Sequence, residues 1–415
     1  MGRFFSDAVE TALQYLYYDL RAGKGAEAME ILKKASEEGD GDASCLLARC
    51  YGGHEFMWTG HNFEENYSAM VAAMRKSLEQ GSALGTLVAK RCLTEKIWET
   101  MPEVNFQEAF RIILQKAEAG EPYCQYTIGN VYFWMDFPEI EGVTVASFPD
   151  ERAFATYLHE NMWKCEDWFL KSMAGGYLSA FNNLGTFYKT GNDGWVEPQP
   201  ERVPKVVQYA AEHGHPDAQW SYGSILEKAG NVKEAYYWYE QAALGGQFEC
   251  CAAMGYAYLN GKVVSKDIER AVEWYEKAVQ QVEDTSFKYR AKSQLGYIYC
   301  DGLGNRQRDG EKAFPLLKAA EEHKNTNRIG WLGKCYFRGW GTPQDYGKAR
   351  ECFEQETNRD AEANYMLGVI YAQGLGVAED IGKGVRFLKD AANFPEAKAE
   401  LAKYKKPLFG KWTRV

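Results

Sequence analysis

The stretch YAYLNGKVVSKDIERAVEWYEKA, residues Tyr256–Ala278, carries the pattern that decides the fold. It contains two helical segments joined by a glycine-bearing turn, and Gly255 precedes it inside the first helical pattern. A glycine in a helix interior costs about 1 kcal/mol relative to alanine. We expect the second helix of the pair to cross at Gly255, because a residue without a side chain lets two backbones approach closely.

The same arrangement recurs along most of the chain. An L-G-x-x-Y core occurs in AFNNLGTFY, AKSQLGYIY, GWLGKCY and ANYMLGVIY, and weaker copies are YTIGNVY and WSYGSIL. The glycine position falls, in order, at Ala48, Val88, Gly129, Gly185, Gly223, Gly255, Gly296, Gly333, Gly368 and Ala402. A period of roughly 36 residues is typical of a solenoid of stacked helix pairs. The sequence therefore predicts an all-α solenoid of about ten helix-turn-helix repeats, without a sheet.

Two segments resemble a known repeat family. AAMGYAYLNGKVVSKDIERAVEWYEKA and ANYMLGVIYAQGLGVAEDIGKGVRFLKDAA are similar to the Sel-one-like repeat (SLR), a relative of the tetratricopeptide repeat (TPR). The resemblance is strong over residues 180–392 and degenerate over 43–132, where Ala48 and Val88 replace the glycine and Arg91 replaces the tyrosine. It implies a right-handed α-α superhelix that acts as an adaptor or scaffold in protein complexes rather than as an enzyme.

The repeats divide the chain into five predicted parts. They are an N-terminal capping helix pair (1–42), two degenerate repeats (43–123), a repeat with an aromatic insertion (124–179), six well-matched SLR repeats (180–396), and a C-terminal capping helix over Ala397–Tyr404 with a basic tail (397–415). Each repeat packs mainly on its neighbours, so the array forms one continuous body.

Composition argues against several classes of protein. The formal net charge of −10 disfavours a general nucleic-acid binder, which would present a basic face. No apolar run is long enough for a membrane span, and Ser6, Asp7 and Glu10 interrupt the place where a signal peptide would be apolar. The ten cysteines show neither the regular offsets of a disulfide framework nor the clustering of a zinc site. We therefore expect free thiols, no metal and a cytoplasmic location.

The common catalytic motifs do not occur in the sequence. There is no G-x-x-x-x-G-K-[ST], no H-E-x-x-H and no G-x-S-x-G. The G-x-G pairs belong to the turns between repeat helices, and the histidines of EHGHPD, residues 212–217, suit a helix C-terminus, where positive charge is favourable. The sequence predicts no catalytic residue and no cofactor.

A stripe along the first helices predicts the surface that a partner would contact. Positions −3, +1 and +4 from the glycine lie on a different face from the packing positions, and in the superhelix that the resemblance implies they line the concave groove. The stripe contains Tyr126, Asn130, Phe133, Asn182, Thr186, Lys189, Trp220, Ser224, Glu227, Ala252, Tyr256 and Leu259. Amides can pair with an extended peptide backbone, and aromatic side chains dominate binding hot spots. The alternative is that these are ordinary half-exposed helix positions.

Aromatic insertions are the second candidate for partner binding. The step from Gly129 to Gly185 is longer than the others, and the excess lies near FWMDFPEIEGVTVASFPDERAF, residues 133–154, which includes Trp134 and Phe137. Similar loops are HEFMWTGHNF, residues 54–63, and GNDGWVEPQP, residues 191–200, which includes Trp195. Insertions in a solenoid collect at one edge, often the binding edge.

The long insertion has two interpretations. Pro138 and Pro149 argue against a hidden helix pair, and GVTVASF predicts a short extended segment. As a recognition loop, residues 136–147 could be replaced without loss of stability, because repeats are stabilised by their stacking interfaces. As a cover over the core, the same replacement would destabilise the neighbouring repeats.

The favoured function is a non-enzymatic scaffold that binds a partner protein or peptide in its groove and along its loop rim. A variant is an immunity protein that wraps a toxin or effector, and the alternative of another class is an enzyme or small-ligand binder using the central groove. Stabilisation by a small ligand in a thermal-shift screen would favour that alternative. The expected partner is a protein or peptide, with neither nucleic acid nor membrane.

Overall fold

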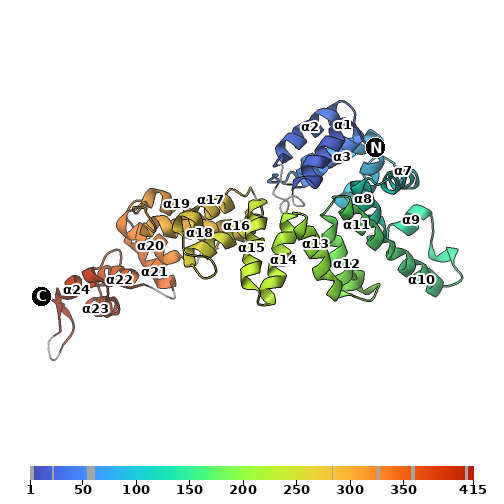
Figure 1. Ribbon diagram of the computed structural model, residues 1–415. Coiled ribbons are helices and arrows are strands. Elements are labelled where there is room, and N and C mark those ends of the chain that lie inside the picture. The colour runs from blue at the N-terminus through green and yellow to red at the C-terminus, as the bar shows by residue number, and fades with distance from the viewer. Residues whose placement is uncertain are drawn as a thin grey trace. The chain divides into compact units, whose positions relative to one another are not determined.

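The computed structural model describes residues 4–20, 23–53, 61–282, 284–324, 328–356, 360–406 and 410–415 (Figure 1). Contacts within the chain divide it into two compact units, Met1–Cys250 and Cys251–Val415. The first part of the predicted aromatic loop HEFMWTGHNF, residues 54–60, lies outside the described residues.

Helices make up the regular structure that is described in Met1–Cys250. They are α1 (Asp7–Leu13), the π-helix η1 (Gln14–Tyr18), α2 (Gly25–Glu37), α3 (Gly41–Gly52), α4 (Tyr67–Glu79), α5 (Ala83–Cys92), α6 (Glu95–Trp98), α7 (Phe106–Glu118), α8 (Pro122–Phe133), α9 (Phe137–Glu141), the 3-10 helix η4 (Val145–Ser147), α10 (Glu151–Met162), α11 (Lys164–Ala174), α12 (Ala180–Gly194), the 3-10 helix η5 (Pro200–Arg202), α13 (Val203–Glu212), α14 (Pro216–Lys228) and α15 (Val232–Leu244). Helix α16 (Phe248–Asn260) spans the division between the units.

Cys251–Val415 continues the helical pattern and adds one strand pair. Its elements are α17 (Ile268–Val279), α18 (Ser286–Asp301), α19 (Gly310–Glu322), α20 (Ile329–Arg338), α21 (Tyr346–Gln355), α22 (Ala361–Gln373), α23 (Ile381–Asp390), α24 (Pro395–Leu401), β1 (Tyr404–Lys405) and β2 (Thr413–Arg414). The strands are antiparallel, with Tyr404 opposite Arg414. The expectations of a final helix as far as Tyr404 and of a chain without any sheet were therefore wrong at this end.

The structure confirms the all-α repeat fold. Within each unit, first and second helices pack as pairs, as α3 does on α4, α14 on α15, and α22 on α23. Each first helix also packs on the second helix of the preceding pair, as α14 does on α13 and α18 on α17. A stack of helix hairpins results, in which each apolar face is covered by a neighbouring repeat.

The second helix crosses the first at the repeated glycine, as the sequence predicts. An added Cβ atom at Gly255 would lie 2.7 Å from the ring of Tyr275, and one at Gly129 would lie 2.6 Å from the ring of Phe169. Such distances are too short for any residue with a side chain. The ring packed directly on the backbone offsets the low helix propensity of glycine.

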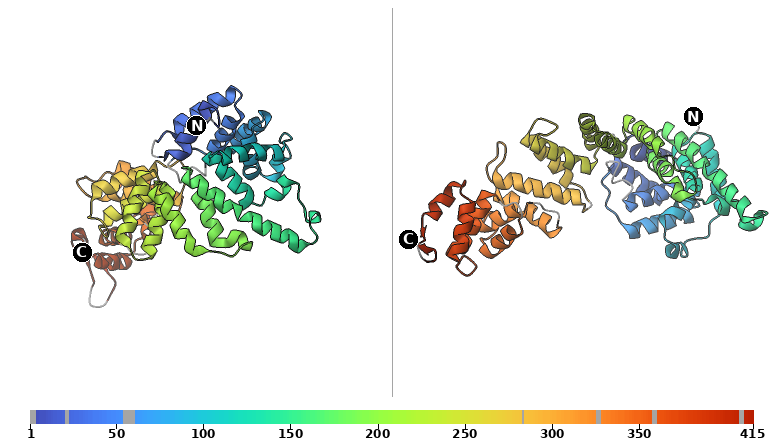
Figure 2. Two further views of the ribbon diagram at one scale, coloured as in Figure 1. Left: turned by 45° about the vertical axis from the view of Figure 1, so that its right-hand side comes forward. Right: turned by 90° about the horizontal axis from the view of Figure 1, so that it is seen from below.

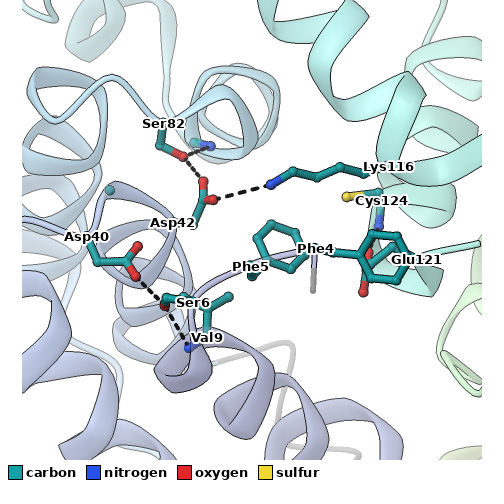
Figure 3. Close-up of polar contacts among 12 residues, drawn as sticks. Phe4, Phe5, Ser6, Val9, Asp40, Asp42, Ser82, Lys116, Glu121 and Cys124 are labelled. Carbon is teal, nitrogen blue, oxygen red and sulfur yellow. Dashed lines mark hydrogen bonds and ion pairs between the residues drawn. The ribbon is translucent and has the colours of Figure 1, made fainter. Parts of the chain in front are cut away.

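Polar contacts hold the N-terminal segment against later helices (Figure 3). The Ser6 hydroxyl caps α1 and donates a hydrogen bond to Asp40, immediately before α3. In the first turn of α3, Asp42 lies 3.7 Å from the ammonium of Lys116 on α7, and that ammonium lies 3.9 Å from the centre of the Phe5 ring. These contacts fix the start of the chain against α3 and α7.

The insertion is mostly helical, contrary to the sequence-based prediction. Met135 takes a left-handed backbone (φ 57°) after α8 and turns the chain into α9. Pro138 lies in the first turn of α9, where its missing N–H breaks no helical hydrogen bond. The predicted extended segment GVTVASF contains η4, and α10 follows; Figures 1 and 2 show α9 and α10 at an outer edge of this unit. Helix α8 packs mainly on α11, which follows these elements in the chain.

Candidate functional site

A polar hollow of about 150 Å³ lies on the first helices of Met1–Cys250. It is lined by Arg49 of α3; Leu87, Val88 and Arg91 of α5; Tyr123, Tyr126, Thr127, Asn130 and Val131 of α8; Trp134 and Asp136 after α8; and Asn183 of α12. Three of the predicted contact residues, Tyr126, Asn130 and Trp134, meet here. The stripe on α8 and the start of the insertion therefore line one hollow.

An amide network connects the first helices along this face. The Asn183 side chain of α12 donates to the Asn130 carbonyl oxygen at 2.6 Å and to the Tyr126 hydroxyl at 3.4 Å, both on α8. The neighbouring Asn182 donates to Asp217 of α14 at 3.3 Å. Because the Asn130 carbonyl is engaged by Asn183, its NH₂ group is oriented as a donor.

Cations from α3 and α5 line the hollow. The Arg91 guanidinium donates to the Asp136 carboxylate at 2.5 Å, and the Lys90 ammonium lies 3.6 Å from the same carboxylate. Burial raises the pKa of Asp136, and Arg91 and Lys90 oppose that rise. Arg49 donates to the Cys92 sulfur at 2.9 Å. These cations, with the amide network, make the lining rich in hydrogen-bond donors, which favours ligands that present acceptors.

Buried tyrosines form the base of the site, and one of them comes from the N-terminal segment. The ring of Tyr17 on η1 lies 5.1 Å from the ring of Tyr123 and 5.1 Å from that of Tyr177, centre to centre. The ring of Tyr126 lies 4.6 Å from that of Tyr177, centre to centre, and is tilted by 32° from it. The neighbouring Tyr18 donates to Glu121 at the start of α8. The N-terminal segment thus supports α8 from beneath the polar hollow.

The predicted contact residues differ in exposure. Asn182, Thr186 and Lys189 are exposed on α12, whereas Tyr126, Asn130, Trp220 and Ser224 are half-buried. Among the loop aromatics, Trp134 is 49% exposed and Trp195 is 44% exposed. Tyr256 is exposed on α16 but belongs to Cys251–Val415.

Phe133 and Phe137 require a correction. They are 2% and 0% exposed, respectively, so they cannot contact a partner in this structure. Phe133 packs edge-on against Phe169 of α11, with ring centres 6.0 Å apart, and Phe137 packs 5.4 Å from Tyr132. The offset of Phe133 from the glycine is exposed at Lys189 but buried at Leu259, which the stripe also contains, so the offset alone does not place a side chain at the surface. Phe137 is buried because α9 folds back against α8.

Sequence reasoning missed Arg49, Asn183 and Asp217. Arg49 stands one residue after Ala48, at the same offset as Asn130, so extending the stripe into the degenerate repeats would have found it. Asp217 lies one helical turn before Trp220 on the same face, which periodicity also indicates. Asn183 lies between two stripe positions, and only the structure shows that it turns toward α8.

Two carboxyl groups beside this face have raised pKa values. Burial raises the pKa of Asp217 to about 6, with the Asn182 hydrogen bond opposing the rise. Burial also raises the pKa of Glu249 to about 7, and the nearby Asp217 charge adds to that shift. Burial lowers the pKa of His215 to about 3, and its ring lies 3.0 Å from the Ser179 hydroxyl. The histidine is therefore neutral at physiological pH.

Neither a metal centre nor a membrane span is found among the described residues. In those segments no group of three or more His, Cys, Asp or Glu side chains could hold a metal ion. The helices of the same segments include none that is long and apolar enough to cross a bilayer.

Comparison with known proteins identifies the repeats. Five consecutive segments match the Sel1 repeat family, residues 216–247, 248–281, 290–325, 330–355 and 361–393. These segments cover most of residues 180–392, where the family resemblance is strong, but not residues 180–215. The first helices that line the polar hollow precede the matched segments.

The chain is also similar to curated proteins and to a solved structure. The chain is 27% identical over 248 residues to the ERAD-associated E3 ubiquitin-protein ligase component HRD3B of Arabidopsis thaliana, covering 49% of this chain and 40% of that protein. It is 24% identical over 330 residues to the chitin synthase regulator SKT5 of Saccharomyces cerevisiae, covering 72% of this chain and 46% of that protein. The chain thus spans less than half the length of these relatives. A protective antigen of uropathogenic Escherichia coli with an SLR fold aligns with 95% of this chain and 78% of its own, at 22% identity and a TM-score of 0.42.

Proposed function

Because five segments between residues 216 and 393 match the Sel1 repeat, we propose that this chain is a non-enzymatic scaffold that binds a segment of a partner protein. One relative is named as a component of a ubiquitin ligase and another as a regulator of chitin synthase. Those names support an accessory role in an assembly. The ten free cysteines support a reducing compartment such as the cytoplasm.

The observation that carries the proposal is the polar hollow at the meeting of α3, α5, α8 and α12. Side chains there are already held in place: Asn183 fixes Asn130, and Arg91 is held by Asp136. A preorganised surface loses little conformational entropy when a partner binds. Trp134 stands at the edge of the hollow with half of its surface exposed, as an aromatic anchor would.

In the proposed complex, an extended peptide crosses α8, α12 and α14. Its backbone carbonyls accept hydrogen bonds from the Asn130 and Asn182 amides, and an acceptor-bearing side chain enters the hollow toward Arg49. Thr186 and Lys189 contact the peptide farther along α12. Trp220 and Ser224 extend the surface on α14.

The test uses the partner obtained by affinity capture from the native cell. Trp134→Ala is expected to weaken its binding by about 2 kcal/mol, roughly 30-fold, because a large anchor side chain is lost. Since Trp134 is half-exposed, the melting temperature should change little. Tyr237→Ala is the matched control, as Tyr237 is 54% exposed on the second helix α15, away from the hollow. Equal loss of binding in both variants, or in neither, would contradict the assignment.

A further inference from the structure

One repeat departs from the packing that the others share. In α8, α14 and α16 the repeated glycine lies against a ring of the second helix, that of Phe169, Tyr239 or Tyr275. At Gly185 of α12, the only described atom within 4 Å of an added Cβ would be Cγ1 of Val203, at 4.0 Å. Helix α13 therefore stands away from α12 where the two helices cross.

Side-chain size explains the wider separation. In the next repeat, an added Cβ at Gly223 would meet the backbone oxygen of Ala235 and the ring of Tyr239, four residues later. The two equivalent positions of α13, also four residues apart, are Val203 and Val207. The β-branched Val203 stands where α15 has alanine and keeps the backbones apart, and Val207 is too short to fill the space of a tyrosine ring.

A second hollow, of about 520 Å³, opens beside this crossing. It is lined by Leu170, Met173 and Ala174 of α11, Tyr188 of α12, Arg202 of η5, and Lys205, Val206 and Tyr209 of α13. Its volume falls in the range of small-molecule sites, about 300–1,000 Å³, and its lining is mostly apolar, as theirs is. Leu170 is 42% exposed, so this apolar surface faces solvent rather than the core.

The two cations of this apolar hollow have different surroundings. The guanidinium of Arg202 pairs with Glu166 and lies 4.0 Å from the centre of the Tyr188 ring. Lys205 is exposed and has neither an ion pair nor a hydrogen bond within the described part of the chain. The carboxylates near this end are Glu166, which Arg202 holds, and the exposed Glu201. An anion at the rim would give Lys205 a partner.

We propose that the apolar hollow binds an amphipathic monocarboxylate, with its aliphatic chain between α11 and α13 and its carboxylate at Lys205. A strongly polar ligand would lose hydration against Leu170 and Met173 without compensation. An amphipathic cation would be repelled by Lys205. The apolar hollow shares no residue with the polar hollow on the first helices, so this inference does not depend on the proposed function.

The first experiment is a chain-length series measured by isothermal titration calorimetry on the full chain. Octanoate, decanoate and dodecanoate are used below micelle-forming concentrations. Each added methylene should strengthen binding about fourfold, which corresponds to about 0.8 kcal/mol per buried CH₂. Dodecyltrimethylammonium should bind at least tenfold more weakly than dodecanoate. Absence of binding by dodecanoate at millimolar concentration, or equal binding of the two charge types, would overturn the proposal.

Two variants locate the site. Lys205→Ala should weaken dodecanoate binding about two- to fivefold and leave dodecan-1-ol unaffected, because it removes only a solvent-exposed charge pair. Ala174→Trp should abolish binding of both by filling the hollow, and since Ala174 is exposed the fold should tolerate it. Lys233→Ala removes an exposed lysine from the first turn of α15 and serves as the control. Unchanged binding in Ala174→Trp, or equal losses in Lys205→Ala and Lys233→Ala, would show non-specific adsorption and refute the site.

Discussion

Gly185 and Gly223 occupy the same place in successive repeats but have different surroundings. A Cβ atom at Gly223 would lie 2.7 Å from the Tyr239 ring and 3.0 Å from the Ala235 oxygen. At Gly185 an added Cβ would be in ordinary contact with Val203. The same sequence pattern therefore does not always have the same physical reason. Close helix crossing requires the glycine in most repeats, whereas nothing in the packing of α12 requires it at Gly185.

This difference predicts opposite effects of the same substitution. Gly185→Ala should raise the free energy of unfolding by up to about 1 kcal/mol, because alanine favours the helix and meets no obstacle. Gly223→Ala should lower it by about 1–3 kcal/mol, because the backbone of Ala235 cannot move aside without opening the pair. Urea unfolding of the two variants measures both effects. Destabilisation of similar size in both would show that α12 and α13 pack as the other pairs do.

Titration of Asp217 gives a second prediction at this scale. Burial raises the pKa of Asp217 to about 6, so between pH 4 and 6 the folded chain binds this proton more strongly than the unfolded chain does. The stabilising contribution of Asp217 to the free energy of unfolding is therefore greatest at low pH and is lost as the pH rises through 6. Asp217→Asn removes that loss and should be about 2 kcal/mol more stable than the parent chain at pH 7.5, with little difference near pH 4.

The variant must be compared with the parent chain because the titration of His215 changes the free energy of unfolding with pH in the opposite direction to that of Asp217. Burial lowers the pKa of His215 to about 3, so its contribution grows as the pH rises through the ordinary range of histidine. Both chains contain this histidine, and its effect cancels in the difference. Thermal melts from pH 4 to 7.5 provide the measurement. A difference that does not change with pH would mean that Asp217 is ionised throughout.

At the scale of elements, the insertion has a buried part and an exposed part. Phe137 and Ile140 of α9 are 0% and 3% exposed, and Asp136 ties the segment to α5. The residues of η4 are exposed. We therefore expect replacement of residues 136–147 to destabilise the chain through loss of α9, and replacement of the segment around η4 alone to leave stability unchanged.

Replacement experiments separate the two parts. A Gly/Ser linker in place of residues 136–147 should lower the free energy of unfolding by about 3 kcal/mol or more, because it removes a buried phenylalanine and a buried isoleucine. The same linker over residues 143–147 alone should stay within about 0.5 kcal/mol, as expected for exposed positions. Circular dichroism melts give both values. An unchanged melting temperature in the longer replacement would show that α9 does not contribute to stability.

At the scale of the whole molecule, the number of free thiols indicates the redox compartment, and the burial of each thiol determines how fast it reacts. Nine of the ten cysteines are buried and Cys92 is half-buried. Burial raises the pKa of Cys50, Cys251 and Cys352 to about 12, which suppresses the reactive thiolate. Titration of the denatured, unreduced chain should count close to ten thiols, and in the native chain Cys92 should react first. A count of four or fewer would place the protein in an oxidising compartment.

The sequence by itself determined the helix pairs outside the insertion, their order and the close glycine crossings other than the one expected at Gly185. These depend on contacts between neighbouring repeats, so a local pattern such as L-G-x-x-Y contains the information. The stripe on α8 and α12 followed from helical periodicity, and Asn130 and Trp134 could be named without coordinates.

Only the tertiary structure decided what brings these residues into one site. Tyr17 reaches Tyr123, more than a hundred positions later, and no periodicity within a repeat encodes such a contact. The burial of Phe133 depends on its packing against α11 and α12, and that of Phe137 on how α9 folds back against α8. The wide spacing at Gly185 shows only when α13, with Val203, is placed on α12. Local spacing sets the partners of a helix, whereas side-chain volume and chain reversal set the shape of the surface between them.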